Sequence, residues 1–149
     1  MATILINRYH FLVDWGGIRT EFLEVSGLEM AIEVIAVREG SSKVESENKI
    51  PGLLKFSDVS FTRAIQKGDN DFFNWINTRS FGTVERRDVR ITLLNERHEP
   101  LILWKLRNCF PVRYAGPTLI GNSSNIATET LVITHEGLDI ESLAGNEKG

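Results

Sequence analysis

The feature of this sequence that most constrains its fold is an alternation of apolar and polar side chains with a period of two. In residues 9–15 every second side chain is aromatic or apolar, and residues 89–93 and 126–135 follow the same pattern. Successive side chains of a β-strand point to opposite faces, so this period predicts strands that bury one face.

Turn residues divide the alternating segments. Gly16 and Gly17 follow the first of them and accept the positive φ angles of a tight turn, which predicts a β-hairpin over residues 9–25. A second hairpin with a polar loop is predicted over residues 89–106. A turn is expected at residues 50–52, and further strands are expected over residues 31–38, 53–65 and 126–135.

One segment has helical periodicity. Phe72, Trp75, Ile76 and Arg79 are spaced at i, i+3, i+4 and i+7, which predicts a helix of about ten residues that ends at Phe81-Gly82. Strands do not alternate with helices, which argues against a parallel doubly wound sheet. The predicted fold class is mainly β: a small antiparallel β-barrel or sandwich with one short flanking α-helix.

Composition indicates the number of domains and the classes of function that are less favoured. The chain has 149 residues, 42% of them apolar, which fits a single domain over residues 1–149 with a flexible or interface tail at 139–149. The net charge of −3 gives no strong attraction to nucleic acid or to an anionic membrane. Neither a signal-peptide pattern nor a run of about 18 apolar residues is evident, so we expect synthesis in the bacterial cytoplasm and no stable membrane association.

The residues that could carry chemistry do not form a recognisable group. His10, His98 and His135 share no metal-ligand spacing, and Cys109 has no cysteine-enzyme signature around it. The acidic pair Asp69 and Asp71 lacks the remaining ligands of a calcium loop and is better explained by helix capping. We therefore predict no catalytic residue, no metal site and no cofactor, and expect the three tryptophans to lie in the core.

Several short motifs follow one another in a fixed order along nearly the whole chain. They occupy residues 9–13, 21–28, 38–40, 50–56, 61–63, 70–75, 86–91, 104–111 and 129–138. No single motif is diagnostic, but the ordered set resembles the tail-tube proteins of contractile phage tails and extracellular contractile injection systems. Tube proteins of type VI secretion systems share the fold and are more distant relatives.

The resemblance implies a structural role rather than an enzymatic one. It implies a β-barrel subunit with a flanking helix, and a homo-hexameric ring in which strands of all six subunits line one lumen. Rings would stack into a hollow tube for a payload protein or DNA, inside a sheath, with baseplate or initiator and cap proteins at its ends. The particle would be a phage tail or an extracellular injection particle.

Two sets of residues are candidates for roles in such an assembly. A polar loop at residues 39–49 suits an arm that reaches a neighbouring subunit, and a threonine-rich strand face suits a water-filled lumen. The predicted arm residues are Glu39, Ser41, Ser42, Lys43, Glu45, Glu47 and Lys49. The predicted lumen residues are Thr128, Thr130 and Thr134.

Two alternatives stay open. A tube-initiator or baseplate paralogue would share the fold but begin or cap the tube. A small β-barrel enzyme that binds a cofactor of the flavin type would need arginine, lysine, serine and threonine residues grouped around an open pocket, and no such group can be assigned from the sequence.

Overall fold

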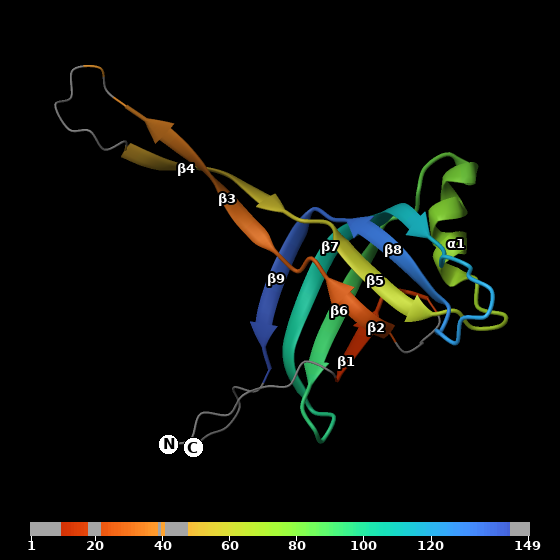
Figure 1. Ribbon diagram of the computed structural model, residues 1–149. Coiled ribbons are helices and arrows are strands. Elements are labelled where there is room, and N and C mark those ends of the chain that lie inside the picture. Colours follow the sequence, from red (N-terminus) through yellow and green to blue (C-terminus); the bar gives the residue numbers. More distant parts are fainter. Residues whose placement is uncertain (1–9, 18–21, 39, 41–47, 144–149) are drawn as a thin grey trace.

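The computed structural model describes residues 10–17, 22–38, 40 and 48–143. Within these ranges, two antiparallel sheets pack face to face, a helix flanks one end, and a long two-stranded ribbon projects away from the body (Figure 1). The elements are β1 (Phe11–Asp14), β2 (Phe22–Ser26), β3 (Met30–Val37), β4 (Asn48–Phe56), β5 (Val59–Ala64), α1 (Asp71–Ile76), the 3₁₀ helix η1 (Asn77–Phe81), β6 (Arg87–Leu94), β7 (Pro100–Ala115), β8 (Thr128–Thr134) and β9 (Gly137–Ser142).

The fold class predicted from the alternation is confirmed as a mainly β sandwich. The strands follow the order β1-β6-β7-β8-β5-β2, and β9 also pairs with β7. Sheet I consists of β1, β6, the first half of β7 and β9; sheet II consists of the second half of β7, β8, β5 and β2. No described residues pair β1 with β2, so the structure is an open sandwich rather than a closed barrel.

The two predicted hairpins have different outcomes. The hairpin over residues 89–106 is confirmed, because β6 pairs with β7 across the turn. The hairpin over residues 9–25 is wrong: β1 pairs with β6 and β2 pairs with β5, on opposite sheets. Alternation correctly predicted that β1 buries one face, but a period of two does not select the partner strand. Strand β1 lies in sheet I and β2 lies in sheet II, and apolar side chains of both strands point into the core between the two sheets.

Strand β7 joins the two sheets because it bends between its halves. Asn108 has a positive φ of 50°, and the register with β6 shifts next to it. The β8–β9 segment bends at the same level, where the Glu136 amide donates to the Arg107 carbonyl oxygen and the Asn108 side-chain amide donates to the Glu136 carboxylate. A bulge of this kind redirects a strand from one sheet to the other.

The core lies between the two sheets and under α1. Trp15 and Trp75 are almost completely buried, as predicted, whereas Trp104 is only partly buried at the edge of the core. Burial of a large apolar side chain contributes about 1.5–3 kcal/mol, so this cluster is the main source of stability. The other buried core residues are Val13, Val59, Phe61, Phe72, Val89, Ile91, Leu106, Cys109, Leu131, Ile133 and Leu138.

The predicted helix is confirmed. Its first turn is stabilised by Asp69, the residue before the N-cap residue Asn70. Helix α1 continues directly into η1, which ends before Gly82, and Phe72 and Trp75 face the core. Asn70 makes no capping hydrogen bond through its side chain. The Asp69 carboxylate instead accepts a hydrogen bond from the amide of Asp71 at 3.2 Å. No helix within the described residues combines the length and the hydrophobicity needed to cross a bilayer.

The projecting ribbon, which we call the arm, consists of β3 and β4. The turn predicted at residues 50–52 is wrong, because these residues lie inside β4, where Pro51 pairs with Val34. Each arm strand has only one partner, and such an edge position tolerates proline. The strand predicted over residues 53–65 is two strands, separated at Ser57 and Asp58 where the arm joins the body.

The first residues of the segment predicted as a flexible or interface tail, 139–149, form part of a strand. Residues 139–142 belong to β9 and pair with β7, with Asp139 opposite Lys105. Lys105 and Glu141 also form an ion pair at 3.0 Å on this sheet. Residues 144–149 lie outside the described ranges.

Candidate assembly surfaces

The arm exposes apolar side chains on both of its faces. Every residue of β3 is exposed, and in β4 only Gly52 and Phe56 are partly covered. Ile32 pairs with Leu54 on one face, and Ile35 pairs with Ile50 on the other. The exposed large apolar residues of the arm are Met30, Ile32, Val34, Ile35, Val37, Ile50, Leu53 and Leu54.

A two-stranded ribbon of this composition is not stable alone in water. Isolated hairpins are marginal, and an exposed apolar surface of this extent marks an interaction site. Sequence reasoning assigned the arm function to polar residues 39–49 and missed the apolar strands on either side. The available signal was the sequence Met30–Val37, in which apolar residues occupy both strand faces instead of one.

Of the predicted arm residues, the structure describes Lys49. Lys49 is in β4, opposite Ala36, and is therefore part of a strand rather than of a loop. Its role in contacts with another subunit stays a prediction. The other predicted arm residues, Glu39, Ser41, Ser42, Lys43, Glu45 and Glu47, lie outside the described residues.

The base of the arm, which we call the neck, is fixed by Gly27, Glu29, Ser57 and His135. The Ser57 amide donates to the Glu29 carbonyl oxygen at 3.3 Å, and His135 Nε2 donates to the Ser57 carbonyl oxygen at 3.0 Å. Gly27 has a φ of +91°, and a Cβ atom there would collide with the carbonyl oxygen of Asp58. The neck therefore sets the direction in which the arm leaves the body.

The outer face of sheet II is rich in hydroxyl groups. The structure brings the predicted Thr128, Thr130 and Thr134 together on one face of β8, opposite the buried Leu131 and Ile133. Residues of β5 continue this face: Thr62 pairs with Thr130, and their hydroxyl groups hydrogen-bond at 3.1 Å. Ser60 and Ser26 extend it further, as cross-strand partners of each other. That this face lines a lumen stays a prediction.

Beneath this face lies a buried ionic cluster around Arg63. Arg63 is 1% exposed, and its Nε donates to Glu129 at 2.8 Å while its two terminal nitrogens bind Asp69 at 3.1 Å. The guanidinium carbon lies 3.9 Å from the ring centroid of Phe72. Tyr114 donates to the second Glu129 oxygen at 2.7 Å.

The Arg63 cluster connects β5, β8, β7 and the start of α1, so it holds the helix against sheet II. Partial burial, followed by the hydrogen bond to Glu129, raises the pKa of the Tyr114 hydroxyl above its ordinary value. The phenol therefore stays protonated and keeps donating at neutral pH. The sequence contained one signal for this cluster, because Arg63 falls on the apolar face of its strand between Phe61 and Ile65.

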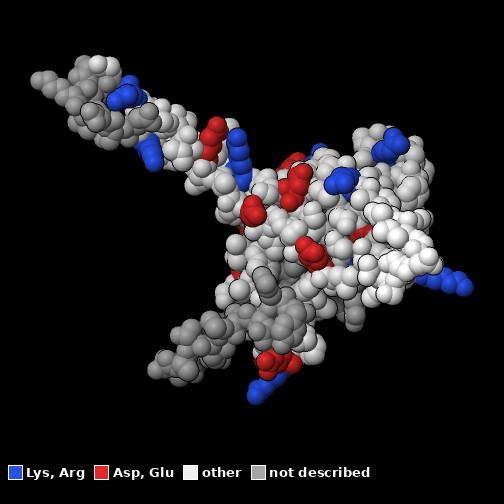
Figure 2. Space-filling view, viewed as in Figure 1, with Lys and Arg blue, Asp and Glu red and all other residues white. Residues whose placement is uncertain are grey.

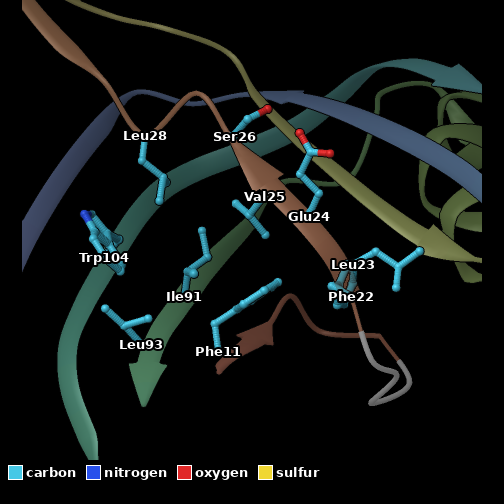
Figure 3. Close-up of a pocket in the computed structure, with 10 residues that line it drawn as sticks. All are labelled: Phe11, Phe22, Leu23, Glu24, Val25, Ser26, Leu28, Ile91, Leu93 and Trp104. Atoms are coloured by element: carbon cyan, nitrogen blue, oxygen red, sulfur yellow. The ribbon is translucent and has the colours of Figure 1, made fainter. Parts of the chain in front are cut away.

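A pocket of about 820 Å³ opens between the sheets at the β1–β2 side (Figure 3). Its lining includes Phe11, Val25, Leu28, Leu93 and Trp104, and also Glu24 and Ser26, whose polar ends are directed away from these apolar side chains (Figure 3). Among its described lining residues there is no arginine or lysine.

The described cysteine and histidines, which could act as nucleophile or metal ligands, do not form one cluster. Cys109 is a completely buried free thiol, and burial raises its pKa to about 12. The His10 and His98 rings lie 5.3 Å apart, whereas His135 is at the neck. The described residues contain no group of three or more side chains arranged to hold a metal ion.

Several charged side chains of the surface form ion pairs with a neighbour. Figure 2 shows lysine and arginine side chains spread over the visible face rather than gathered in one basic patch. Arg86, in the densest basic segment of the sequence, forms an ion pair with Glu136 at 2.9 Å. The hydrogen bond from Asn108, together with Arg86, lowers the pKa of Glu136. This segment therefore stabilises the corner between the sheets.

Comparison with known structures finds chains of contractile injection systems that are similar to this one. A chain of the sheath–tube complex of PVC, an extracellular contractile injection system, in its extended state is 26% identical, with a TM-score of 0.84 over 93% of each chain. A chain of the cap that terminates the anti-feeding prophage (AFP) tube is 26% identical, with a TM-score of 0.86 over 95% of this chain and 94% of that one.

A more distant structure shares only the fold. Hcp1 from Flavobacterium johnsoniae is 17% identical, with a TM-score of 0.60 over 89% of this chain and 94% of that one. No curated protein sequence gives a significant match. The family model described as T4-like virus tail tube protein gp19 matches residues 7–139. The chain belongs to this tail tube protein family.

Proposed function

We propose that this protein is the structural subunit of the inner tube of a contractile injection system or phage tail. Six copies form a ring, and rings stack into a hollow conduit through which a payload protein or DNA passes. A sheath protein surrounds the tube, and baseplate and cap proteins contact its ends. The complexes named among the similar structures, which include a sheath, a tube cap and a baseplate, support these partners.

The observation that carries this proposal is the apolar arm. A ribbon with apolar side chains on both faces is stable only when another surface covers it, and the arm points away from its own body (Figure 1). A second copy of the chain provides that surface. Because the arm and the surface it covers are different regions of the subunit, the contact is heterologous and continues from copy to copy.

The hydroxyl-rich face of sheet II supports the conduit. Threonine and serine side chains are wetted by water yet carry no charge, so they bind neither polyanions nor apolar surfaces strongly. With Thr62, Thr128, Thr130 and Thr134 facing the bore, the lumen is polar and weakly adhesive.

The test is electron microscopy of the purified protein in negative stain, together with size-exclusion chromatography. We expect rings or hollow tubes of uniform width. The double variant Ile32→Lys, Leu54→Lys places two charges on one arm face and should remain a folded monomer. The matched control is Leu119→Lys, Ile120→Lys, which alters two exposed apolar residues of the β7–β8 loop.

Two results would contradict the proposal. Tubes formed by the arm variant as readily as by the wild type would show that the arm does not mediate assembly. A wild-type protein that stays monomeric at every concentration, even with baseplate components present, would contradict the tube function itself.

A tube-initiator or cap role is the second candidate, because a chain of a tube terminator is as similar to this protein as a chain of a sheath–tube complex. The same micrographs separate the two. A main tube protein extends into long tubes, whereas an initiator or cap stops at a single ring.

A further inference from the structure

The two edges of sheet II differ in charge. Glu24 lies on the edge strand β2, and Arg113 lies on β7, the strand at the opposite edge. Both side chains are exposed, and among the described residues neither takes part in an ion pair. Each edge also presents an exposed apolar residue, Leu23 on β2 and Val112 on β7.

The cross-strand register places both charges on the outer, hydroxyl-rich face. One row of partners across the sheet is Glu24, Thr62, Thr130 and Ala115. The adjacent row is Ser26, Ser60, Val132 and Arg113. Partners within a row share a face, so the sheet has an anion at one edge and a cation at the other, one row apart.

Both edges are free to accept another strand. Strand β2 pairs only with β5, and the β7 residues beyond Cys109 pair only with β8 within the described part of the chain. All three pairings in sheet II are antiparallel, so β2 and β7 run in opposite directions. A second copy that places its β2 beside this β7 therefore continues the antiparallel order without interruption.

We propose that Arg113 and Glu24 form the ion pair that selects the contact, or joint, between neighbouring copies when β7 of one copy lies beside β2 of the next. When the rows continue across the joint, these two side chains are diagonal neighbours, within reach of long side chains. The contact between β7 of one copy and β2 of the next also covers Leu23 and Val112. This inference rests on the proposed tube function and names the surfaces through which neighbouring copies of a ring recognise each other.

Charge reversal at the two positions tests the joint. Glu24→Arg places two cations at every joint, and Arg113→Glu places two anions there. Opposed like charges are strongly unfavourable at an interface, so each variant should need a protein concentration about tenfold or more above wild type for half-maximal ring or tube formation. Both positions are exposed, so the thermal unfolding of each monomer should match wild type.

Two combinations should restore assembly. In the variant Glu24→Arg, Arg113→Glu every joint again pairs opposite charges, with the signs exchanged. An equimolar mixture of the two single variants should form mixed rings. When copies of the Glu24→Arg variant alternate with copies of the Arg113→Glu variant, the charges at both kinds of joint are opposite and attract each other. Native mass spectrometry of the mixture should show equal numbers of the two variants in each ring.

The controls are Glu96→Arg and Arg97→Glu in the β6–β7 turn, which change charge by the same amounts outside sheet II. These should assemble as wild type does. Single reversals at Glu24 and Arg113 that assemble normally, or single reversals that neither combination rescues, would overturn the proposed ion pair while leaving the tube function intact. A wild-type protein that forms neither rings nor tubes would instead contradict the tube function.

Discussion

The body and the arm of this protein bury their apolar side chains to opposite extents. In β5 every second residue is buried, and Arg63 is enclosed with its charge satisfied. In the arm, Leu53 is 72% exposed and β3 has no buried residue. The body therefore contains the interactions needed for its own folding, whereas we propose that the arm gains stability from a surface of another copy. Substitutions in the two regions should affect different measurements.

The largest effect on folding should come from the Arg63 cluster. Arg63→Ala leaves Asp69 and Glu129 as buried carboxylates without their partner, which typically costs about 3–5 kcal/mol. Urea unfolding of the monomer should show this loss. Arg97→Ala, an exposed arginine in a turn, is the control and should change stability by about 0.5 kcal/mol or less. An equally small effect of Arg63→Ala would mean that the cluster does not stabilise the body.

A smaller effect is expected at the junction of the two regions. Gly27→Ala forces a side chain into the left-handed region and against the Asp58 carbonyl group, which should cost about 1–3 kcal/mol. Because the neck orients the arm, tube yield should fall as well. Gly68 has a similar φ of +81° with nothing near its Cβ position, so Gly68→Ala is the matched control. Tubes of normal yield from Gly27→Ala would show that the arm direction is set elsewhere.

Within the body, Cys109 should make stability depend on alkaline pH. Its folded pKa, about 12, exceeds the ordinary value of 9.0, so the unfolded state loses its proton first as the pH rises. The unfolding free energy is therefore unaffected by the ionisation of Cys109 below pH 9. It falls between pH 9 and 12, by roughly 1 kcal/mol at pH 10. The unfolding free energy of the wild type should fall more steeply over this range than that of Cys109→Ala. If the unfolding free energies of the wild type and of Cys109→Ala fall in parallel as the pH rises, the buried thiol does not cause the pH dependence.

The smallest effect on folding is expected in the arm. Ile35→Ser removes an exposed side chain, so the unfolding free energy of the monomer should change by about 0.5 kcal/mol or less. The concentration needed for assembly should nevertheless rise. A loss of monomer stability comparable to that of a core substitution would show that the arm packs on its own body in solution.

The sequence predicted the positions of the strands and of the helix better than it predicted which strands pair with each other. Alternation located β1, β6 and β8, and the spacing of Phe72 and Trp75 located the helix, because both patterns depend on which side of a single element is buried. Strand pairing depends on contacts between distant residues, so Gly16 and Gly17 suggested a hairpin where β1 and β2 instead lie on opposite sheets. The motif order was needed to identify the family.

The candidate surfaces also divide into those that depend on a single strand, which could be predicted, and those that depend on strand pairing, which could not. The threonine face of β8 could be predicted, since it depends only on alternation along one strand. The apolar arm and the charged edges at Glu24 and Arg113 could not, because they become visible only when the cross-strand register is known.

The bend in β7 also has a mechanical consequence. A single backbone of 16 residues runs through both sheets, and the β8–β9 segment is hydrogen-bonded beside it across the corner. A pull on one sheet along these strands is transmitted to the other through covalent bonds, and sliding the two strands apart requires many hydrogen bonds to break together. The two layers of the sandwich should therefore respond to axial force as one stiff element, and not only as two sheets whose facing side chains pack together.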